Sequence, residues 1–172
     1  MNNIKKTILS VDKNGTKRYY TNGQLDRKCG PAIESIDGSK VWYKNGTLHR
    51  EDGPAIEYTS GNKYWYKNGS YHRENGPAIE YADGSKCWYK NGKLHRENGP
   101  AYEWHDGDKC WYKNGGLHRE DGPAIEWRTT TEWFLNNKQQ QQRKTTLHFT
   151  FYNYNGIHTN SHIVRFARGR PR

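Results

Sequence analysis

Residues 65–87 read WYKNGSYHRENGPAIEYADGSKC, and residues 88–110 repeat that text almost letter for letter. Aligned on the aromatic residue that opens each unit, the copies begin 23 residues apart, and a truncated last copy follows after 22. Self-similarity at a fixed period is the signature of a repeat architecture, in which each unit packs on the next. The units begin at Tyr19, Trp42, Trp65, Trp88, Trp111 and Trp133.

Three turn signals recur in the units and separate short runs of β-forming residues. In the unit that begins at Trp65 they are Asn68-Gly69, Gly76-Pro77 and Asp83-Gly84. Glycine adopts positive φ without strain, and Asn or Asp tolerates it, so these dipeptides predict tight turns. The runs between them, such as PAIEY, are too short for helices. We therefore predict an all-β protein with a single elongated antiparallel sheet of tandem β-hairpins, in which the Asn-Gly to Gly-Pro stretch is a long bend between the two strands.

Alternation along the predicted strands sorts the side chains onto two faces. In the run KYWYK, Tyr64 and Tyr66 point one way, and Lys63, Trp65 and Lys67 point the other way. In PAIEY, the Ile and the Tyr oppose the Ala and the Glu. One face is thus expected to carry a Tyr, Ile and Cys column and the other a Trp, Ala, Lys and Glu column. Identical residues stacked at a fixed repeat stabilise the array through nearest-neighbour contacts.

The composition limits the class of protein. Only 31% of the 172 residues are hydrophobic, which argues against a thick two-layer core, yet 7 Trp, 13 Tyr and 4 Phe are too many aromatic residues for a disordered chain. No stretch approaches the ~18 apolar residues of a membrane span, and the polar start lacks the hydrophobic run of a secretory signal. We expect a cytoplasmic location, which includes the cytoplasm of an infected host cell.

The three cysteines are predicted to be reduced. Cys87 and Cys110 stand one period apart, so two strands per unit would place their backbones ~10 Å apart, beyond disulfide reach. Cys29 stands in another column, where other units carry Asp or Asn. We expect all three to be small filler residues.

The period and the turn chemistry, in wording such as KNGKLHRENG at residues 90–99, resemble the MORN repeat, a family of tandem β-hairpins whose pattern also runs Lys-Asn-Gly, His, Gly, aromatic and Asp-Gly. The resemblance covers about residues 8–138, and similar arrays occur in large DNA viruses and bacteria. The array resembles a divergent variant of the family, because arginine follows each His of the triplets where the family has glycine. The resemblance implies a scaffold for proteins or, in some members, binding of phospholipid headgroups.

A His-Arg-Glu triplet in four units is the best candidate for chemistry. A His beside a carboxylate is suited to acid–base catalysis or metal binding. Equivalent histidines should step by ~10 Å, whereas one metal needs its ligands at ~2 Å. The sequence favours a structural role, in which His and Arg brace the bend by pairing with Glu or Asp; a binding ladder for phosphates or acidic side chains remains open, and catalysis is least favoured. We predict no catalytic residue, metal site or cofactor. The triplets begin at His49, His72, His95 and His118.

The composition changes near the end of the repeats. We divide the chain into an N-terminal half-repeat cap (1–18), the array of five units plus a fragment (19–138), a Gln-rich linker (139–144) and a basic tail (145–172). Residues 1–137 hold 21 basic and 18 acidic residues, whereas residues 138–172 hold 7 basic and no acidic ones. Residues 145–166 alternate and contain Asn155-Gly156, so they predict either a capping hairpin or a poorly ordered segment.

The last five residues, Arg168-Gly169-Arg170-Pro171-Arg172, resemble the AT-hook core, in which an Arg-Gly-Arg segment lies in the narrow minor groove of A·T-rich DNA. A solvated basic end that binds anions nonspecifically is the alternative interpretation. The candidate nucleic-acid contacts are Arg165, Arg168, Gly169, Arg170 and Arg172.

The function predicted first is that of a non-enzymatic scaffold, which binds a protein partner through a repeated aromatic and charged surface. The alternative is a nucleic-acid-associated protein that binds DNA through its tail. Open sheet edges also predict a homodimer. Trp and Arg most often anchor interfaces, so the candidate protein contacts are taken from their columns. These contacts are Trp42, Trp65, Trp88, Trp111, Arg50, Arg73, Arg96 and Arg119.

Overall fold

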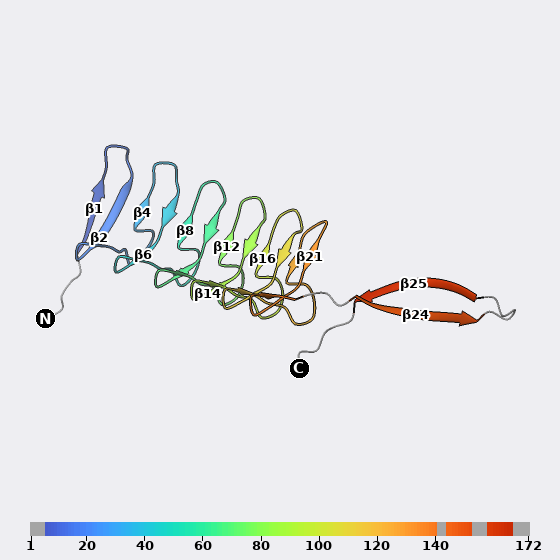
Figure 1. Ribbon diagram of the computed structural model, residues 1–172. Coiled ribbons are helices and arrows are strands. Elements are labelled where there is room, and N and C mark those ends of the chain that lie inside the picture. The colour runs from blue at the N-terminus through green and yellow to red at the C-terminus, as the bar shows by residue number, and fades with distance from the viewer. Residues whose placement is uncertain (1–5, 141–143, 153–157, 167–172) are drawn as a thin grey trace.

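A computed structural model of the chain describes residues 6–140, 144–152 and 158–166 (Figure 1). The described residues form strands and turns and no helix, so none of them belongs to a helix that could cross a membrane. Successive hairpins pair side by side into one long, open antiparallel sheet, as the repeat pattern predicts. The predicted all-β fold is therefore confirmed.

The main sheet takes two short strands from each full repeat, in sequence order, because each hairpin pairs with the hairpin that follows it. The N-terminal pair is longer than the rest, and β3 adds to β2 beside the main path. The strands are β1 (Thr7–Val11), β2 (Lys17–Thr21), β3 (Gln24–Leu25), β4 (Ile33–Glu34), β5 (Lys40–Val41), β8 (Ile56–Glu57), β9 (Lys63–Tyr64), β12 (Ile79–Glu80), β13 (Lys86–Cys87), β16 (Tyr102–Glu103), β17 (Lys109–Cys110), β20 (Ile125–Glu126) and β21 (Thr131–Glu132).

The stretch predicted as a long bend is itself a small hairpin, which is a correction to the sequence analysis. Asn68 and Gly69 both have positive φ, of 51° and 79°. Two such residues make a type I′ turn, whose twist matches that of paired strands. The small hairpins form a second row beneath the main sheet (Figure 1). They are β6 (Tyr43–Lys44) with β7 (Thr47–Leu48), β10 (Tyr66–Lys67) with β11 (Ser70–Tyr71), β14 (Tyr89–Lys90) with β15 (Lys93–Leu94), β18 (Tyr112–Lys113) with β19 (Gly116–Leu117), and β22 (Phe134–Leu135) with β23 (Lys138–Gln139).

The run KYWYK was predicted as one strand, but it breaks at the Trp. The amide of Trp65 still donates to the carbonyl of Ala78, at 2.8 Å, and the chain then leaves the main sheet for β10. Ala78 is fully buried, as are its equivalents in the other full repeats. The side chain at this position must be small because the chain changes rows there.

The pairing register confirms the two predicted columns of the main sheet. Across the sheet, Ile56 pairs with Tyr64, which pairs with Ile79, and Ile79 pairs with Cys87. On the alternate positions, Glu and Lys face each other strand after strand, as in the pair Glu80 and Lys86. One face of the sheet is therefore apolar and aromatic, and the other carries alternating charge.

Hydrogen bonds between neighbouring repeats fix the position of each hairpin relative to the next in both rows. In the lower row, the amide of Gly69 donates to the carbonyl of Leu48, at 2.9 Å. At the tips of the main hairpins, the amide of Ala82 donates to Oδ1 of Asn62, at 2.8 Å. Each repeat thus satisfies part of its backbone only through the repeat beside it, as nearest-neighbour stabilisation requires.

The C-terminal hairpin predicted from the sequence is present as β24 (Lys144–Tyr152) paired with β25 (His158–Phe166). The register runs from Lys144 opposite Phe166 to Tyr152 opposite His158. The strands also enter the predicted Gln-rich linker from both sides, because β23 includes Gln139 and β24 begins at Lys144.

The cysteines are free thiols, as predicted, but only two of them are filler residues. Cys87 and Cys110 are each 2% exposed and lie on strands that Tyr102 separates. Burial raises the pKa of Cys87 to about 12 and that of Cys110 to about 11. Cys29 is exposed, which corrects its assignment as filler.

A thiol-reactive probe should therefore label the folded protein at Cys29 alone. The thiolate is the reactive form, and burial disfavours it at Cys87 and Cys110. Labelling with iodoacetamide at neutral pH, followed by peptide mass mapping, should give one fast site in the native protein and three in denaturant. Fast labelling of the native Cys29→Ser variant would contradict this packing.

Candidate functional site

Each full repeat contains an arginine stacked on an aromatic ring. The guanidinium carbon of Arg73 lies 3.9 Å from the centroid of the Trp65 ring. A cation over an indole face contributes about 0.5–1 kcal/mol when exposed and about 2 kcal/mol when desolvated. The pairs are Arg27 with Tyr19, Arg50 with Trp42, Arg73 with Trp65, Arg96 with Trp88 and Arg119 with Trp111.

The same guanidinium holds the strand that follows it. Nη1 of Arg73 donates to the carbonyl of Pro77 at 3.0 Å and to Oε1 of Glu80 at 2.7 Å. A Cβ at Gly76 would lie 3.1 Å from Cζ of Arg73, so the glycine leaves room for the stacked group. The Gly-Pro dipeptide therefore forms the turn and also makes room for the guanidinium and accepts its hydrogen bond. This arrangement recurs in the other full repeats.

The Trp and Arg columns predicted as protein contacts thus lie together, with each Arg bound inside its own repeat. The arginine side chains are 21–29% exposed, and each is engaged by an aromatic ring, a carboxylate and a backbone carbonyl. A partner that used these arginines would compete with those contacts. Their role in protein binding stays a prediction.

The histidine of each triplet links its repeat to the next one. Nδ1 of His72 accepts the amide hydrogen of Asn91 at 3.2 Å, and Asn91 is the positive-φ residue of the next small hairpin. Sequence reasoning missed this link, although the spacing of 19 residues from His to that Asn, which falls to 18 in the last link, was visible. The equivalent amide donors are Asn68 to His49, Asn114 to His95 and Asn136 to His118.

The other imidazole nitrogen binds the triplet carboxylate. Because Nδ1 accepts, Nε2 carries the proton of the neutral ring, and it lies 2.8 Å from Oε1 of Glu74 in the His72 repeat. This hydrogen bond is the first cause of the lowered pKa of Glu74. The predicted bracing of the bend by His and Arg, paired with carboxylates, is therefore confirmed.

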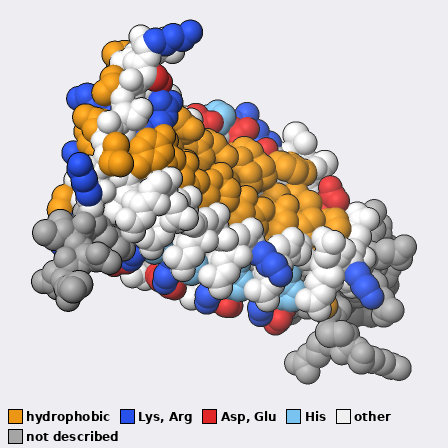
Figure 2. Space-filling view, turned by 90° about the vertical axis from the view of Figure 1, so that its left-hand side faces the viewer, with side chains coloured by type: hydrophobic (Ala, Val, Ile, Leu, Met, Phe, Trp, Pro, Cys, Tyr) orange, Lys and Arg blue, Asp and Glu red, His pale blue; other side chains and the backbone are white. Residues whose placement is uncertain are grey.

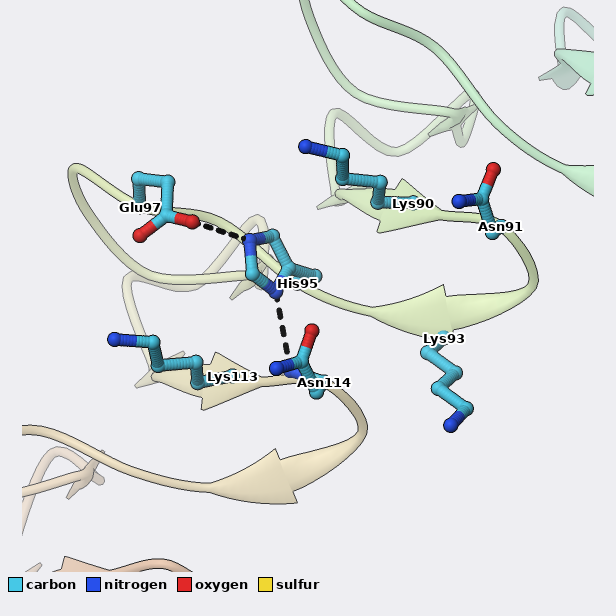
Figure 3. A pocket seen from close by; sticks show the side chains of 7 residues that line it. All are labelled: Lys90, Asn91, Lys93, His95, Glu97, Lys113 and Asn114. Atoms are coloured by element: carbon cyan, nitrogen blue, oxygen red, sulfur yellow. Dashed lines mark hydrogen bonds and ion pairs between the residues drawn. The ribbon is translucent and has the colours of Figure 1, made fainter.

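A shallow recess of about 380 Å³ lies where two small hairpins meet. His95 bridges Glu97 and the Asn114 amide at its centre, and equivalent lysines of the two repeats, Lys90 and Lys113, flank it (Figure 3). The pKa of Glu97 is lowered, first by its hydrogen bond from His95, with both lysines adding positive charge. The polar groups at the centre already bind one another, so the recess is best explained as the junction between repeats.

The face of the main sheet opposite the Lys and Glu column is a continuous band of uncharged aromatic and aliphatic side chains. Figure 2 shows this band running along the array without lysine or arginine inside it. Tyr64 contacts three other tyrosine rings at centroid distances of 5.8–6.3 Å, and Trp104 stacks on Tyr102 at 3.6 Å. The ring contacts join Tyr58, Tyr64, Tyr66, Tyr71, Tyr81 and Tyr89 in one group and Tyr102, Trp104 and Trp127 in another. We call these nine residues the aromatic face.

Partial burial raises the pKa of several tyrosine hydroxyls of this face above the ordinary value of 10. Desolvation raises the pKa of Tyr102 to about 12, and it also raises the pKa of Tyr66 and Tyr81. Tyr58 and Trp127 are 46% and 37% exposed. The aromatic face thus offers apolar rings together with uncharged hydrogen-bonding groups.

The tail residues predicted to contact nucleic acid lie mostly outside the described residues. Arg165 is in β25, opposite Thr145, whereas the residues from Arg168 to Arg172 are not described. Within the described ranges, no three His, Cys, Asp or Glu side chains come together in a way that could hold a metal ion.

Comparison with profiles of known protein families and with curated proteins finds no match to this chain. The tandem hairpins and the repeated Arg–Glu and His–Asn pairs are therefore known from the sequence and structure of this chain alone.

Replacing Gly122 with Ala should destabilise the protein by about 1–3 kcal/mol, the usual cost of overpacking. A Cβ there would lie 2.6 Å from Cζ of Arg119 and displace the guanidinium from Trp111. Gly116→Ala is the matched control, because its Cβ would meet nothing closer than 3.5 Å. Urea unfolding of both variants measures the difference; equal stability would show that the arginine does not need this space.

Replacing His72 with Leu should move the pKa of Glu74 upward, toward its ordinary value of 4.5. Because the carboxyl pKa is lower in the folded state, ionisation of Glu74 stabilises the fold at pH values above the unfolded-state pKa. This contribution is lost as the pH falls through the folded-state pKa. Carboxyl ¹³C NMR titration measures the change. Glu97, which has its own His95, should be unaffected, and an unchanged Glu74 would refute the assigned cause.

Proposed function

We propose that this protein is a non-enzymatic repeat scaffold that binds a protein partner, and that the aromatic face is the contact surface. The observation that carries the proposal is the continuous uncharged band along one side of the array (Figure 2). Contiguous apolar patches larger than a few hundred Å² are uncommon on monomeric proteins and mark interaction sites. Tyr and Trp are also the residues most enriched in the energetic centres of interfaces.

The partner that fits this face is a protein with apolar side chains placed to enter between the rings. Ring edges and neutral hydroxyls favour apolar groups and uncharged hydrogen-bonding groups over ions. On the opposite face, the arginines are held by Trp and Glu of their own repeats. These internal contacts are the reason to prefer the aromatic face over the Trp and Arg columns.

We also propose that the array is a divergent member of the MORN-like hairpin repeats. The 23-residue period, the hairpin in every unit and the Asn-Gly turns support this assignment. The arginine after His is the main departure from the family pattern, and its stack on Trp explains why glycine is absent there. The phospholipid binding of some members would need basic groups, and the arginines of the triplets are already paired with carboxylates of their own repeats.

Two sets of substitutions on opposite faces test the proposal. A partner captured by cross-linking would first be purified, and its affinity for the full chain measured by calorimetry. Replacing Tyr58 and Trp127 with Lys should weaken binding by at least about tenfold, as loss of an interface anchor does. Both side chains are partly exposed, so the fold should tolerate the change.

Charge removal on the other face supplies the control. Lys63→Gln and Lys86→Gln alter exposed residues of the charged face without placing like charges opposite each other, and both should leave the affinity nearly unchanged. The reverse pattern, in which only these variants lose binding, would place the partner on the Trp and Arg columns and overturn the proposed surface.

A further inference from the structure

The two ends of the main sheet are different, and nothing among the described residues protects the N-terminal edge. β1 is five residues long, TILSV, with every residue exposed. Ile8, Leu9 and Val11 are 57%, 51% and 55% exposed, and the strand contains no charge and no Pro. The other end is β21, a two-residue strand of Thr131 and Glu132. Natural proteins block a free edge with charge, Pro, a bulge or a short strand, and β1 has none of these.

The hydrogen-bonding groups of the free edge follow from the pairing of β1 with β2. The Asp12 amide donates to the Thr16 carbonyl, at 3.1 Å. Because such pairs alternate along an antiparallel ladder, Ser10 and Ile8 also direct their backbone groups toward β2. The amides and carbonyls of the intervening residues of β1 point outward. No partner strand covers them among the residues that the structure describes.

A second copy of β1 matches this edge. In an antiparallel pair centred on Leu9, the outward groups of Leu9 face those of the same residue in the second copy, and Thr7 lies opposite Val11. The same register places Lys6 opposite Asp12 at each end. The Asp12 carboxylate already binds Nη1 of Arg18 at 2.7 Å in its own copy, so Lys6 would join an existing ion pair. The backbone register is therefore the main argument for this arrangement.

We propose that two copies of this chain associate through β1, antiparallel about a two-fold axis at Leu9, to form one sheet that runs through both arrays. A two-fold axis closes the assembly at a dimer, because it uses up the long edge of each copy. The aromatic faces of the two copies then lie on the same side of the joined sheet, since pairing in one sheet preserves the side of each strand. The proposal does not depend on the scaffold function.

A single engineered cysteine tests both the contact and its register, in a Cys29→Ser background that removes the exposed thiol. In the proposed pair, the two Leu9 Cα atoms lie about 5.5 Å apart, within disulfide reach. Leu9→Cys should therefore give a covalent dimer on mild oxidation. Thr7→Cys is the matched control, because its two copies would be about 14 Å apart, four residues along the strand.

Light scattering on the full chain gives the second readout. We expect twice the chain mass of 20.2 kDa, and a return to the single mass for Leu9→Lys, which adds charge to an edge position whose backbone is not used within the fold. A single mass at every concentration, or equal cross-linking of the two cysteine variants, would overturn the proposal. Species that keep growing with concentration would show open head-to-tail assembly instead, and would also overturn it.

Discussion

The arginine that lies on the tryptophan ring of its own repeat is the contact on which the rest of each unit depends. One guanidinium meets the Trp65 ring at 3.9 Å, the Pro77 carbonyl at 3.0 Å and the Glu80 carboxylate at 2.7 Å. It therefore ties the beginning of a repeat to its second main strand across the small hairpin. Burying charge is costly unless it is paired, and here each arginine is both paired and stacked. The glycine before Pro leaves space for the guanidinium, and the fully buried alanine lies where the chain crosses between rows.

Contacts of this kind act within a repeat, whereas other contacts join the repeats. The histidine link and the backbone bonds of the small hairpins connect each unit only to its neighbour. Stability in such an array is approximately a sum of unit terms and nearest-neighbour terms. A terminal unit lacks one neighbour, which is why the edges of the sheet matter for assembly. The short, charged β21 is a protected edge, whereas the long, uncharged β1 leaves backbone groups open to pairing among the described residues.

The division of polar and apolar groups between the two faces explains why binding is a better proposal than chemistry. Charged side chains gather on one face and in the lower hairpins, where they pair within their own repeats. The other face carries aromatic rings, and partial burial raises the pKa of tyrosines such as Tyr102 and Tyr81. A repeated surface of this kind presents the same contact several times along one axis. It suits a partner that is extended or that itself repeats.

Much of the fold was readable from the sequence, because a period of 23 residues and its turn dipeptides specify hairpins locally. Alternation also predicted the Tyr, Ile and Cys column on one face of the sheet and the Lys and Glu column on the other face. Only the tertiary structure showed that the strand breaks at Trp65, that the bend is a second hairpin, and that His72 reaches the next repeat. These features depend on contacts between units and on a chain that crosses between two rows. Side-chain periodicity reports which face a residue takes, but not which neighbour its polar atoms will meet.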